Sequence, residues 1–245
     1  MNKVFNGKIM SILRKQEKVL TEHADFRRKL KLSEMLKFTQ EISIEHVTAC
    51  GAGIDRTIDR GFLWVIGRQR FEIERMPLYD EEFELVTWPS KPKYYFMPRS
   101  YEFVSRDGEN LIKGTAVWSL IDESTRHPII PSEHDIPIIG DEVTGRELQL
   151  PPFGLTPELP NVSAFAVHYS DADINGHLNN TAYLSKVMDL IPLDYIKAHE
   201  IKALDVQYRK EIRLGEVVEM KYGLVDDAWW FACDHFRVMI QFESK

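Results

Sequence analysis

The sequence predicts an α+β fold made of two tandem copies of one unit, in each of which antiparallel strands follow a helix. Three observations lead to this prediction: the chain has room for two domains, strand patterns dominate it, and the same order of elements occurs twice. Its 245 residues fit two domains of roughly 120 residues or one large domain. A single α+β domain whose halves resemble each other by accident is the alternative.

The first copy begins with a helix. Met35, Phe38 and Ile42 are spaced i, i+3 and i+7, and Ser33 is a candidate N-cap ahead of them. Alternating apolar residues then predict strands, and Asp107-Gly108 between two such runs predicts a hairpin. The strand residues are Gln69, Phe71, Ile73, Phe83, Leu85, Thr87, Tyr101, Phe103, Ala116, Trp118 and Leu120.

The second copy repeats this order. A strand pattern at Phe165 and Val167 precedes a predicted helix, and further alternating runs follow as far as Phe242. The apolar face of this helix consists of Leu184, Val187, Met188 and Ile191. An offset of 135 residues aligns positions 71, 73 and 75 with 206, 208 and 210, and the break at 79–81 with the break at 214–216. The two copies therefore share a pattern more than they share residue identities.

A proline-rich segment separates the two copies. It contains HPIIPSEHDIPIIG and LPPFGLTPELP, which cannot form a central strand and indicate an extended linker. The expected organisation is an N-terminal extension at 1–15, a first domain at 16–127, a linker at 128–160 and a second domain at 161–245. A long helix held by a strongly curved antiparallel sheet is the hotdog arrangement. The prediction is thus two tandem hotdog domains that pair as a pseudo-dimer.

Composition and charge exclude several classes of protein. The 31 basic and 38 acidic side chains give a net charge of −7, which argues against a nucleic-acid-binding protein. No apolar run approaches the roughly 20 residues that span a bilayer, and the N-terminal residues do not have the pattern of a secretory signal. Two cysteines are too few for a disulfide framework or a structural zinc site. A soluble cytoplasmic protein is expected.

The segment HYSDADINGHLNNTAYLSKVMDL, at 168–190, contains the densest set of functional residue types. Asp171 begins a stretch that fits the start of a calcium-binding loop. The twelfth position of such a loop requires a bidentate Glu, and Ala182 stands there. The residues ahead of Asp171 also predict a strand rather than a helix. Calcium binding is therefore not expected.

A strand-to-helix turn is the preferred interpretation of this segment. In an extended backbone, Asp173, Asn175 and His177 would project to one side, and Gly176 would let the chain bend. A helix that starts near Leu178 would point its free backbone N–H groups at the same place. These groups together provide a base, an orienting group and an oxyanion site, as acyl transfer to water requires. An Asp/Asn-rich capping turn is the alternative.

The segment SDADINGHLNNTAYL resembles the acyl-acyl-carrier-protein thioesterases, whose pattern is D-x-N-x-H followed by x-N-N-x-x-Y. Four further segments resemble that family in the same order: KLKLSEMLKFTQEISIEH, FLWVIGRQRFEIERMPLYDEEFELVTWPS, GTAVWSLIDESTRHPIIP with its Thr-Arg turn, and DVQYRKEIRLGE. The resemblance covers residues 16–243, and the order of the segments makes it specific. The chain has no recognisable transit peptide, as is expected of a bacterial-type member.

The resemblance assigns the family's catalytic residues to positions of this chain. Its Asp, Asn and His correspond to Asp173, Asn175 and His177, and its second carboxylate corresponds to Glu211. Plastid members have a Cys directly after this Glu, which was once proposed as the nucleophile. Ile212 stands there in this chain, which puts a thiol mechanism in doubt.

The resemblance implies a thioesterase that hydrolyses fatty acyl-acyl carrier protein to free fatty acid in fatty acid biosynthesis, without a metal or organic cofactor. In this interpretation Asp173 and Glu211 activate or replace the attacking water. Asn175 and His177 orient the reacting groups, and the backbone near Leu178 stabilises the oxyanion. The alternatives are a hotdog acyl-coenzyme A thioesterase and a non-catalytic acyl-binding module.

The expected partners are acyl carrier protein, a fatty acyl chain and, as an open possibility, a second copy of the chain. Neither a nucleic acid nor a membrane span is expected. Lys91, Lys93 and Arg99 form a basic cluster that could attract an acidic carrier protein, and a solvated loop is the alternative.

The first copy is expected to bind the acyl chain rather than to catalyse. Nothing like the turn at 173–177 precedes its helix, and Met76 takes the position that the offset of 135 pairs with Glu211. The helix residues Met35, Phe38 and Ile42 are therefore candidates for the wall of an acyl-binding tunnel.

Overall fold

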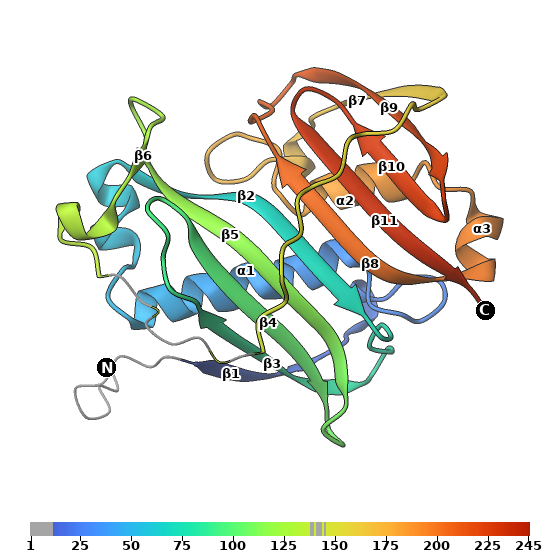
Figure 1. Cartoon of the computed structure of the whole chain (residues 1–245), viewed down its shortest axis with the longest axis horizontal. Helices are drawn as coiled ribbons and strands as arrows, with labels where there is room; N and C mark the ends of the chain where they lie inside the picture. The colour runs from blue at the N-terminus through green and yellow to red at the C-terminus, as the bar shows by residue number, and fades with distance from the viewer. Residues whose placement is uncertain (1–11, 138–139, 141–143, 145) are drawn as a thin grey trace.

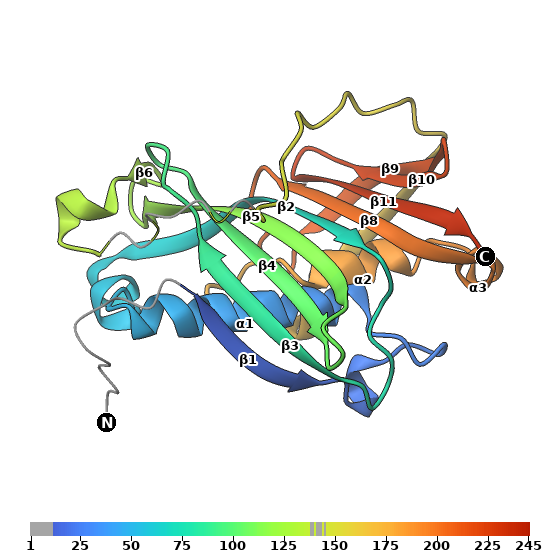
Figure 2. The same ribbon diagram turned by 60° about the horizontal axis from the view of Figure 1, so that its bottom comes forward.

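The computed structural model describes residues 12–137, 140, 144 and 146–245, and it consists of one curved antiparallel sheet with helices on its concave face (Figures 1 and 2). The described strands form the order β1-β3-β4-β5-β2-β8-β11-β10-β9-β7, with β6 paired to β5. The α+β prediction is therefore confirmed. None of the described helices combines the length and the apolar character needed to cross a bilayer.

The first half of the sheet lies on α1. This helix, Leu32–Ala49, follows β1 (Leu13–Lys18), and its buried face includes Met35, Leu36 and Ile42. The remaining strands are β2 (Phe62–Ile73), β3 (Glu82–Pro89), β4 (Met97–Ser105), β5 (Asn110–Asp122) and β6 (Pro128–Ile129). Strand β1 begins within the segment 1–15 that we expected as an extension, and residues 1–11 of that segment lie outside the described residues.

The second half has the same order of elements but a shorter helix. Helix α2 covers Ala182–Met188, and α3 covers Leu193–Ala198. The sequence pattern predicted one helix through Ile191; Pro192 prevents this, because proline disfavours helical conformation in the preceding residue. The strands are β7 (Asn161–Ala166), β8 (His199–Tyr208), β9 (Val217–Val225), β10 (Ala228–Ala232) and β11 (Phe236–Ser244).

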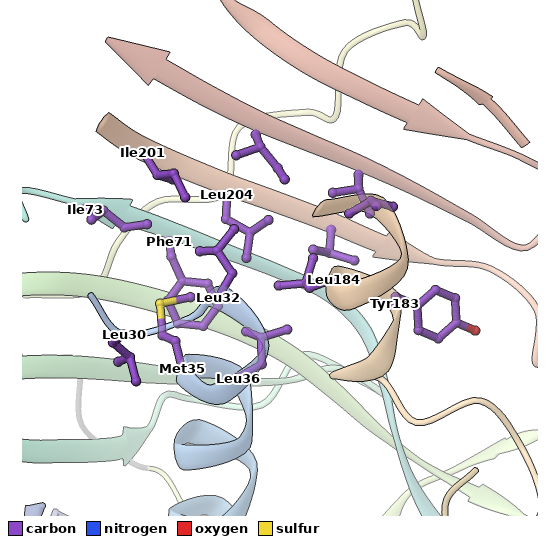
Figure 3. Close-up of a cluster of buried hydrophobic side chains, with 14 of the residues drawn as sticks. Leu30, Leu32, Met35, Leu36, Phe71, Ile73, Tyr183, Leu184, Ile201 and Leu204 are labelled. Atoms are coloured by element: carbon purple, nitrogen blue, oxygen red, sulfur yellow. The ribbon is translucent and has the colours of Figure 1, made fainter. Parts of the chain in front are cut away.

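The two halves join through the central strands. Strands β2 and β8 pair antiparallel, with Phe71 opposite Leu204, so the two sheets become one. Helices α1 and α2 lie side by side beneath this junction, and Figure 3 shows Met35, Leu184 and Phe71 among the side chains that meet there. The main hydrophobic core is thus shared by both halves. A smaller cluster of Ala52, Phe62, Leu120 and Ile136 lies within the first half.

The offset of 135 residues predicted from the sequence holds in the structure. It relates Asp80, at a φ of 72°, to Gly215, at a φ of 82°, so both turns have a left-handed residue at the same place. It also relates Pro77 to Ile212. The carbonyl of Pro77 accepts the N–H of Leu30, and the carbonyl of Ile212 accepts the N–H of Leu178. The two halves therefore repeat each other in backbone geometry.

Residues 146–160, between the halves, cross the outer face of the sheet as an extended strap (Figure 1). Arg68 donates to the carbonyl of Pro151 (2.7 Å), and Thr115 donates to the carbonyl of Leu148 (2.8 Å). The guanidinium of Arg237 lies 4.4 Å from the centre of the Phe153 ring. Part of the predicted linker, at 138–139, 141–143 and 145, lies outside the described residues.

Candidate active site

The segment that carries Asp173, Asn175 and His177 is a tight turn held by its own aspartate. Oδ1 of Asp173 accepts hydrogen bonds from the backbone N–H groups of Asn175 (2.9 Å) and His177 (3.0 Å). The turn closes where the N–H of Asp173 binds the carbonyl of His177 (2.8 Å), and Gly176 has a φ of 74°. The expectation of an extended backbone was wrong, because a short Asp side chain can hydrogen-bond the backbone ahead of it and bend the chain.

The predicted oxyanion site at Leu178 is also wrong. The N–H of Leu178 donates to the carbonyl of Ile212 (2.7 Å), so it does not point into an open site. Helix α2 begins only at Ala182. In the turn before it, the side chain of Asn179 accepts a hydrogen bond from the N–H of Thr181. Residues 179–181 thus separate the helix from the start that the sequence pattern assigned to it.

Backbone pairing brings Glu211 to the turn. The bond from Leu178 to Ile212 and the bond from Leu214 to the carbonyl of Gly176 (2.9 Å) hold residues 212–214 alongside the turn. Oε2 of Glu211 then lies 3.5 Å from Nε2 of His177. Ile212 is fully buried, so a side chain at this position faces the core rather than the site.

One pocket of about 380 Å³ contains all four predicted catalytic residues. Asp173, Asn175, His177 and Glu211 come from the second half, whereas residues 63–67 of β2 line the same pocket from the first half. The described lining also includes Ile121, Arg126, Leu178, Asn180, Tyr183, Tyr208, Arg209 and Lys210. The site therefore lies at the junction of the two halves and is formed within one chain.

Arg126 is a site residue that the sequence reasoning missed. Arg126 follows β5 in the first half, and its Nη2 donates to Oε1 of Glu211 in the second half. The Thr-Arg turn was noticed in the sequence only as part of a resemblance. No local pattern indicates a pair of residues 85 positions apart.

Two tyrosines line the pocket, of which Tyr183 is buried and Tyr208 is partly buried. Tyr183 is 2% exposed, and burial raises its pKa, so its phenol stays neutral at physiological pH. Burial likewise raises the pKa of Tyr208, whose hydroxyl donates to the carbonyl of Asn180 (3.0 Å). The rings of Tyr183 and Tyr208 pack edge to face, with 5.4 Å between their centres.

An apolar pocket lies beside this site in the first half. Trp64 lines both pockets, and its indole N–H has no hydrogen-bond partner among the described residues. The other described lining residues are Ser43, Ile44, Val47, Pro89, Met97, Pro98, Arg99, Trp118 and Pro137. Trp64 thus separates a polar site from an apolar one.

The predicted acyl-wall residues do not line either pocket. Met35 and Ile42 are almost fully buried in the core, and Phe38 packs edge to face against Phe83. The helix contributes Ser43, Ile44 and Val47 to the apolar pocket instead. The sequence pattern identified the helix correctly, but it could not separate the core-facing stripe from the neighbouring residues that face a pocket.

The basic cluster expected at Lys91, Lys93 and Arg99 does not form one surface. Lys91 and Lys93 are exposed, but Arg99 is only 4% exposed. Its Nη1 lies within hydrogen-bonding distance of Nδ1 of His46 (2.9 Å) and Oγ1 of Thr87 (3.2 Å). Arg99 therefore belongs to the interior of the first half.

Asp171, the first residue of the rejected calcium loop, has a structural partner. Its carboxylate pairs with Nζ of Lys186 on α2 (2.9 Å) and accepts the N–H of His168 (2.9 Å). These contacts lower the pKa of Asp171 even though burial opposes the shift. Within the described residues, no three His, Cys, Asp or Glu side chains gather in a way that could hold a metal ion.

The first half contains a turn with the same backbone geometry as the turn at 173–177. Oδ1 of Asp25 accepts from the N–H groups of Arg27 (2.8 Å) and Lys29 (3.0 Å), and Arg28 has a φ of 60°. The sequence reasoning missed this turn, because arginine and lysine replace asparagine, glycine and histidine in it. Its shape is repeated, whereas its acid–base chemistry is not.

Two family models match the chain. The model described as acyl-ACP thioesterase N-terminal domain matches residues 11–134, and the one described as acyl-ACP thioesterase C-terminal domain matches residues 156–241. The chain is 26% identical over 211 residues to a chloroplastic acyl-[acyl-carrier-protein] hydrolase of Cuphea viscosissima. The alignment covers 77% of this chain and 49% of that protein. The chain therefore spans about half the length of this relative.

Solved structures share the fold. An acyl-ACP thioesterase from Bacteroides thetaiotaomicron superimposes with a TM-score of 0.85 at 23% identity, over 95% of this chain and 98% of that one. The 12:0-ACP thioesterase from Umbellularia californica gives a TM-score of 0.77 at 18% identity, over 96% and 98%. The tandem hotdog fold predicted from the sequence is thereby confirmed.

Proposed function

The chain belongs to the acyl-ACP thioesterase family, and we propose that it hydrolyses the thioester of fatty acyl-acyl carrier protein to a free fatty acid and the carrier protein, in fatty acid biosynthesis. The observation that carries this proposal is the convergence of Asp173, Asn175, His177 and Glu211 on one pocket at the junction of the halves. We further propose that the second half, 161–245, supplies this catalytic group and that the first half, 16–127, binds the acyl chain.

The acid–base groups have distinct geometric roles in this proposal. Oδ1 of Asp173 holds the turn, so Oδ2 is the oxygen that can act on water or on the thioester carbon. Glu211 faces Nε2 of His177, which orients the imidazole toward the reacting groups. Asn175 is exposed in the pocket, and its side-chain amide makes no hydrogen bond to the described residues, so it replaces Leu178 as the proposed oxyanion donor.

Two routes use the same carboxylate. In the first, Asp173 takes a proton from water while the water oxygen attacks the thioester carbon and the thiolate leaves with a proton from His177. In the second, Oδ2 of Asp173 attacks that carbon, the thiolate leaves, and water cleaves the resulting mixed anhydride. Turnover in ¹⁸O-labelled water distinguishes them, since only the second route can place ¹⁸O in the Asp173 carboxylate.

The charge around the pocket fits an anionic carrier. Arg209 and Lys210 line the same pocket as the two carboxylates. Such cations would attract the phosphate of the arm that carries the acyl group, as well as an acidic carrier protein. We keep the cytoplasm as the proposed location, and a second copy of the chain is not needed to complete the pocket.

In this proposal the acyl chain enters the apolar pocket beyond Trp64. Its lining by Ile44, Val47 and Trp118 offers the apolar contacts that a hydrocarbon chain requires. An acyl group bound there would extend past Trp64, with its thioester among the polar residues of the neighbouring pocket.

The proposal is tested by hydrolysis of acyl-carrier-protein and acyl-coenzyme A panels of graded chain length. We expect kcat/KM to be higher for the carrier-protein substrates, and His177→Ala to lower kcat by about 100-fold or more. Faster hydrolysis of the coenzyme A series would instead support an acyl-coenzyme A thioesterase. Binding of acyl chains without hydrolysis of either series would support a non-catalytic acyl-binding module.

A further inference from the structure

Arg126 belongs to the first half of the chain, yet its guanidinium lies in the pocket of the catalytic turn. We propose that Arg126 is a positioning residue for thioester hydrolysis, which acts through Glu211 by holding that carboxylate against His177. This inference rests on the proposed function. It means that the first half contributes to the catalytic centre as well as to acyl binding.

Glu211 needs such a partner because packing does not hold it. Its side chain is 40% exposed, and the terminal torsion of a glutamate is broad when no contact restricts it. One carboxylate oxygen contacts Nη2 of Arg126, and the other lies 3.5 Å from Nε2 of His177. With a basic group on each oxygen, both the position and the rotation of the carboxylate are restricted.

The turn that carries Arg126 is held by several hydrogen bonds to Asp122. Oδ1 of Asp122 accepts four hydrogen bonds, from the backbone N–H and side-chain hydroxyl of both Ser124 and Thr125. These bonds, with the Ser124 hydroxyl first among them, lower the pKa of Asp122 to about 2. The N–H of Arg126 donates to the carbonyl of Asp122 (2.8 Å), which closes the turn. These bonds hold the backbone from which the Arg126 side chain reaches Glu211.

The backbone conformation of Arg126 indicates that its side chain is used. Arg126 has a φ of 60°, a conformation that glycine adopts without strain and arginine does not. Glycine would therefore suit the turn better if only the backbone mattered. The contact with Glu211 is a reason for a long cationic side chain at this place.

The pair contributes to orientation more than to stability. Both side chains are about two-fifths exposed, and exposed ion pairs add little to the free energy of unfolding. Removing Arg126 should consequently change turnover without unfolding the protein. This separates a positioning role from a merely structural one.

The first test compares three variants of the full chain on the best acyl-carrier-protein substrate. Arg126→Gly removes the side chain but suits the left-handed φ, so we expect an unchanged or higher Tm with kcat lowered about 10- to 100-fold. KM should change little, because the substrate-binding contacts remain. Arg126→Lys should restore part of the lost kcat, since it keeps a cation within reach of Glu211.

Arg28→Gly is the matched control. Arg28 also has a φ of 60°, but its turn contacts Tyr79 beyond the far end of β2 and does not touch Glu211. The Arg28→Gly substitution should leave both kcat and KM unchanged. A loss of kcat in Arg28→Gly equal to that in Arg126→Gly would overturn the inference, because the effect would then come from the backbone or the net charge.

A double-mutant cycle with Glu211→Gln decides whether Arg126 acts through Glu211. If it does, Arg126→Gly should lower kcat in the wild-type background and have little further effect in the Glu211→Gln background. Equal losses in both backgrounds, or wild-type kcat in Arg126→Gly, would overturn this inference while leaving the proposed function in place. A wild-type protein that hydrolyses no thioester of either panel would instead overturn the proposed function, and this inference with it.

Discussion

Replacing Asp173 in two ways should separate the two roles of its carboxylate. Oδ1 holds the turn through the N–H groups of Asn175 and His177, whereas Oδ2 is the oxygen proposed to act in hydrolysis. Asp173→Asn keeps an oxygen acceptor for the turn but removes the charge. Asp173→Ala removes both the acceptor and the charge. The two variants should therefore share a loss of activity and differ in stability.

The magnitudes follow from these contacts. Loss of the charged group should lower kcat by about 100-fold or more in both variants. Asp173→Ala also loses two hydrogen bonds of about 1 kcal/mol each. For a chain of this size, a loss of roughly 2 kcal/mol corresponds to a decrease in Tm of roughly 4–8 °C. Asp173→Asn should stay close to the wild-type Tm.

The assay measures kcat on one acyl-carrier-protein substrate and Tm by calorimetry for each variant. The turn at Asp25 supplies a matched control, because Asp25→Ala breaks the same pair of backbone bonds in the first half. It should lower Tm at least as much as Asp173→Ala and leave kcat intact. Wild-type turnover in Asp173→Asn would refute a catalytic role for the carboxylate. An unchanged Tm in Asp173→Ala would refute its role in holding the turn.

Three further outcomes are expected. Burial raises the pKa of both Cys50 and Cys233, so a Cys50→Ser/Cys233→Ser variant should keep its kcat, and a folded but inactive double variant would restore a thiol mechanism. Val47→Phe should fill the space of about two methylenes in the apolar pocket and lower kcat/KM for the longest acyl chains roughly 15-fold, at about 0.8 kcal/mol per methylene. Val162→Phe, at an exposed position, should leave kcat/KM unchanged. An identical chain-length profile for Val47→Phe and the wild type would show that the acyl chain lies elsewhere. The folded-state pKa of Asp122 is lowered from 3.8 to about 2, so its hydrogen bonds stabilise the turn above about pH 4 and are lost as the pH falls toward 2. The decrease in Tm that Asp122→Ala causes should therefore become smaller between pH 4 and pH 2. A decrease in Tm that is the same at both pH values would contradict this.

The fold was predictable because its determinants are local and repeated. Period-2 alternation identified the strands, and the offset of 135 residues related turns that the structure shows to be equivalent, as at Asp80 and Gly215. The pairing of β2 with β8 was not predictable, since any of several apolar strands could have filled the centre of the sheet. The length of the second helix was overestimated, because the apolar spacing continues to Ile191 although Pro192 ends the helical conformation.

The site was predictable only where its residues are close in the sequence. Asp173, Asn175 and His177 share one turn, so their convergence requires little of the tertiary structure. Glu211 was assigned through a family resemblance, and the backbone pairing that brings it to His177 explains the assignment. Arg126 was missed because its role depends on how the two halves meet. Leu178 was misassigned because the sequence does not show which N–H groups the neighbouring segment occupies.

In the proposed function the second half is catalytic, and the repeated turn gives the first half a structural task. In the first half, Arg27 donates to the carbonyl groups of Ile196 (2.6 Å) and His199 (3.0 Å), both in the second half. The first-half turn thus fastens one domain to the other, with Arg27 in the place that corresponds to Asn175. Arg126 crosses the same junction in the opposite part of the molecule to reach Glu211. Strands β2 and β8 pair between the halves that these two contacts join. A tandem fold of this kind can lose the chemistry of one turn, provided that the turn keeps its shape and continues to hold the junction together.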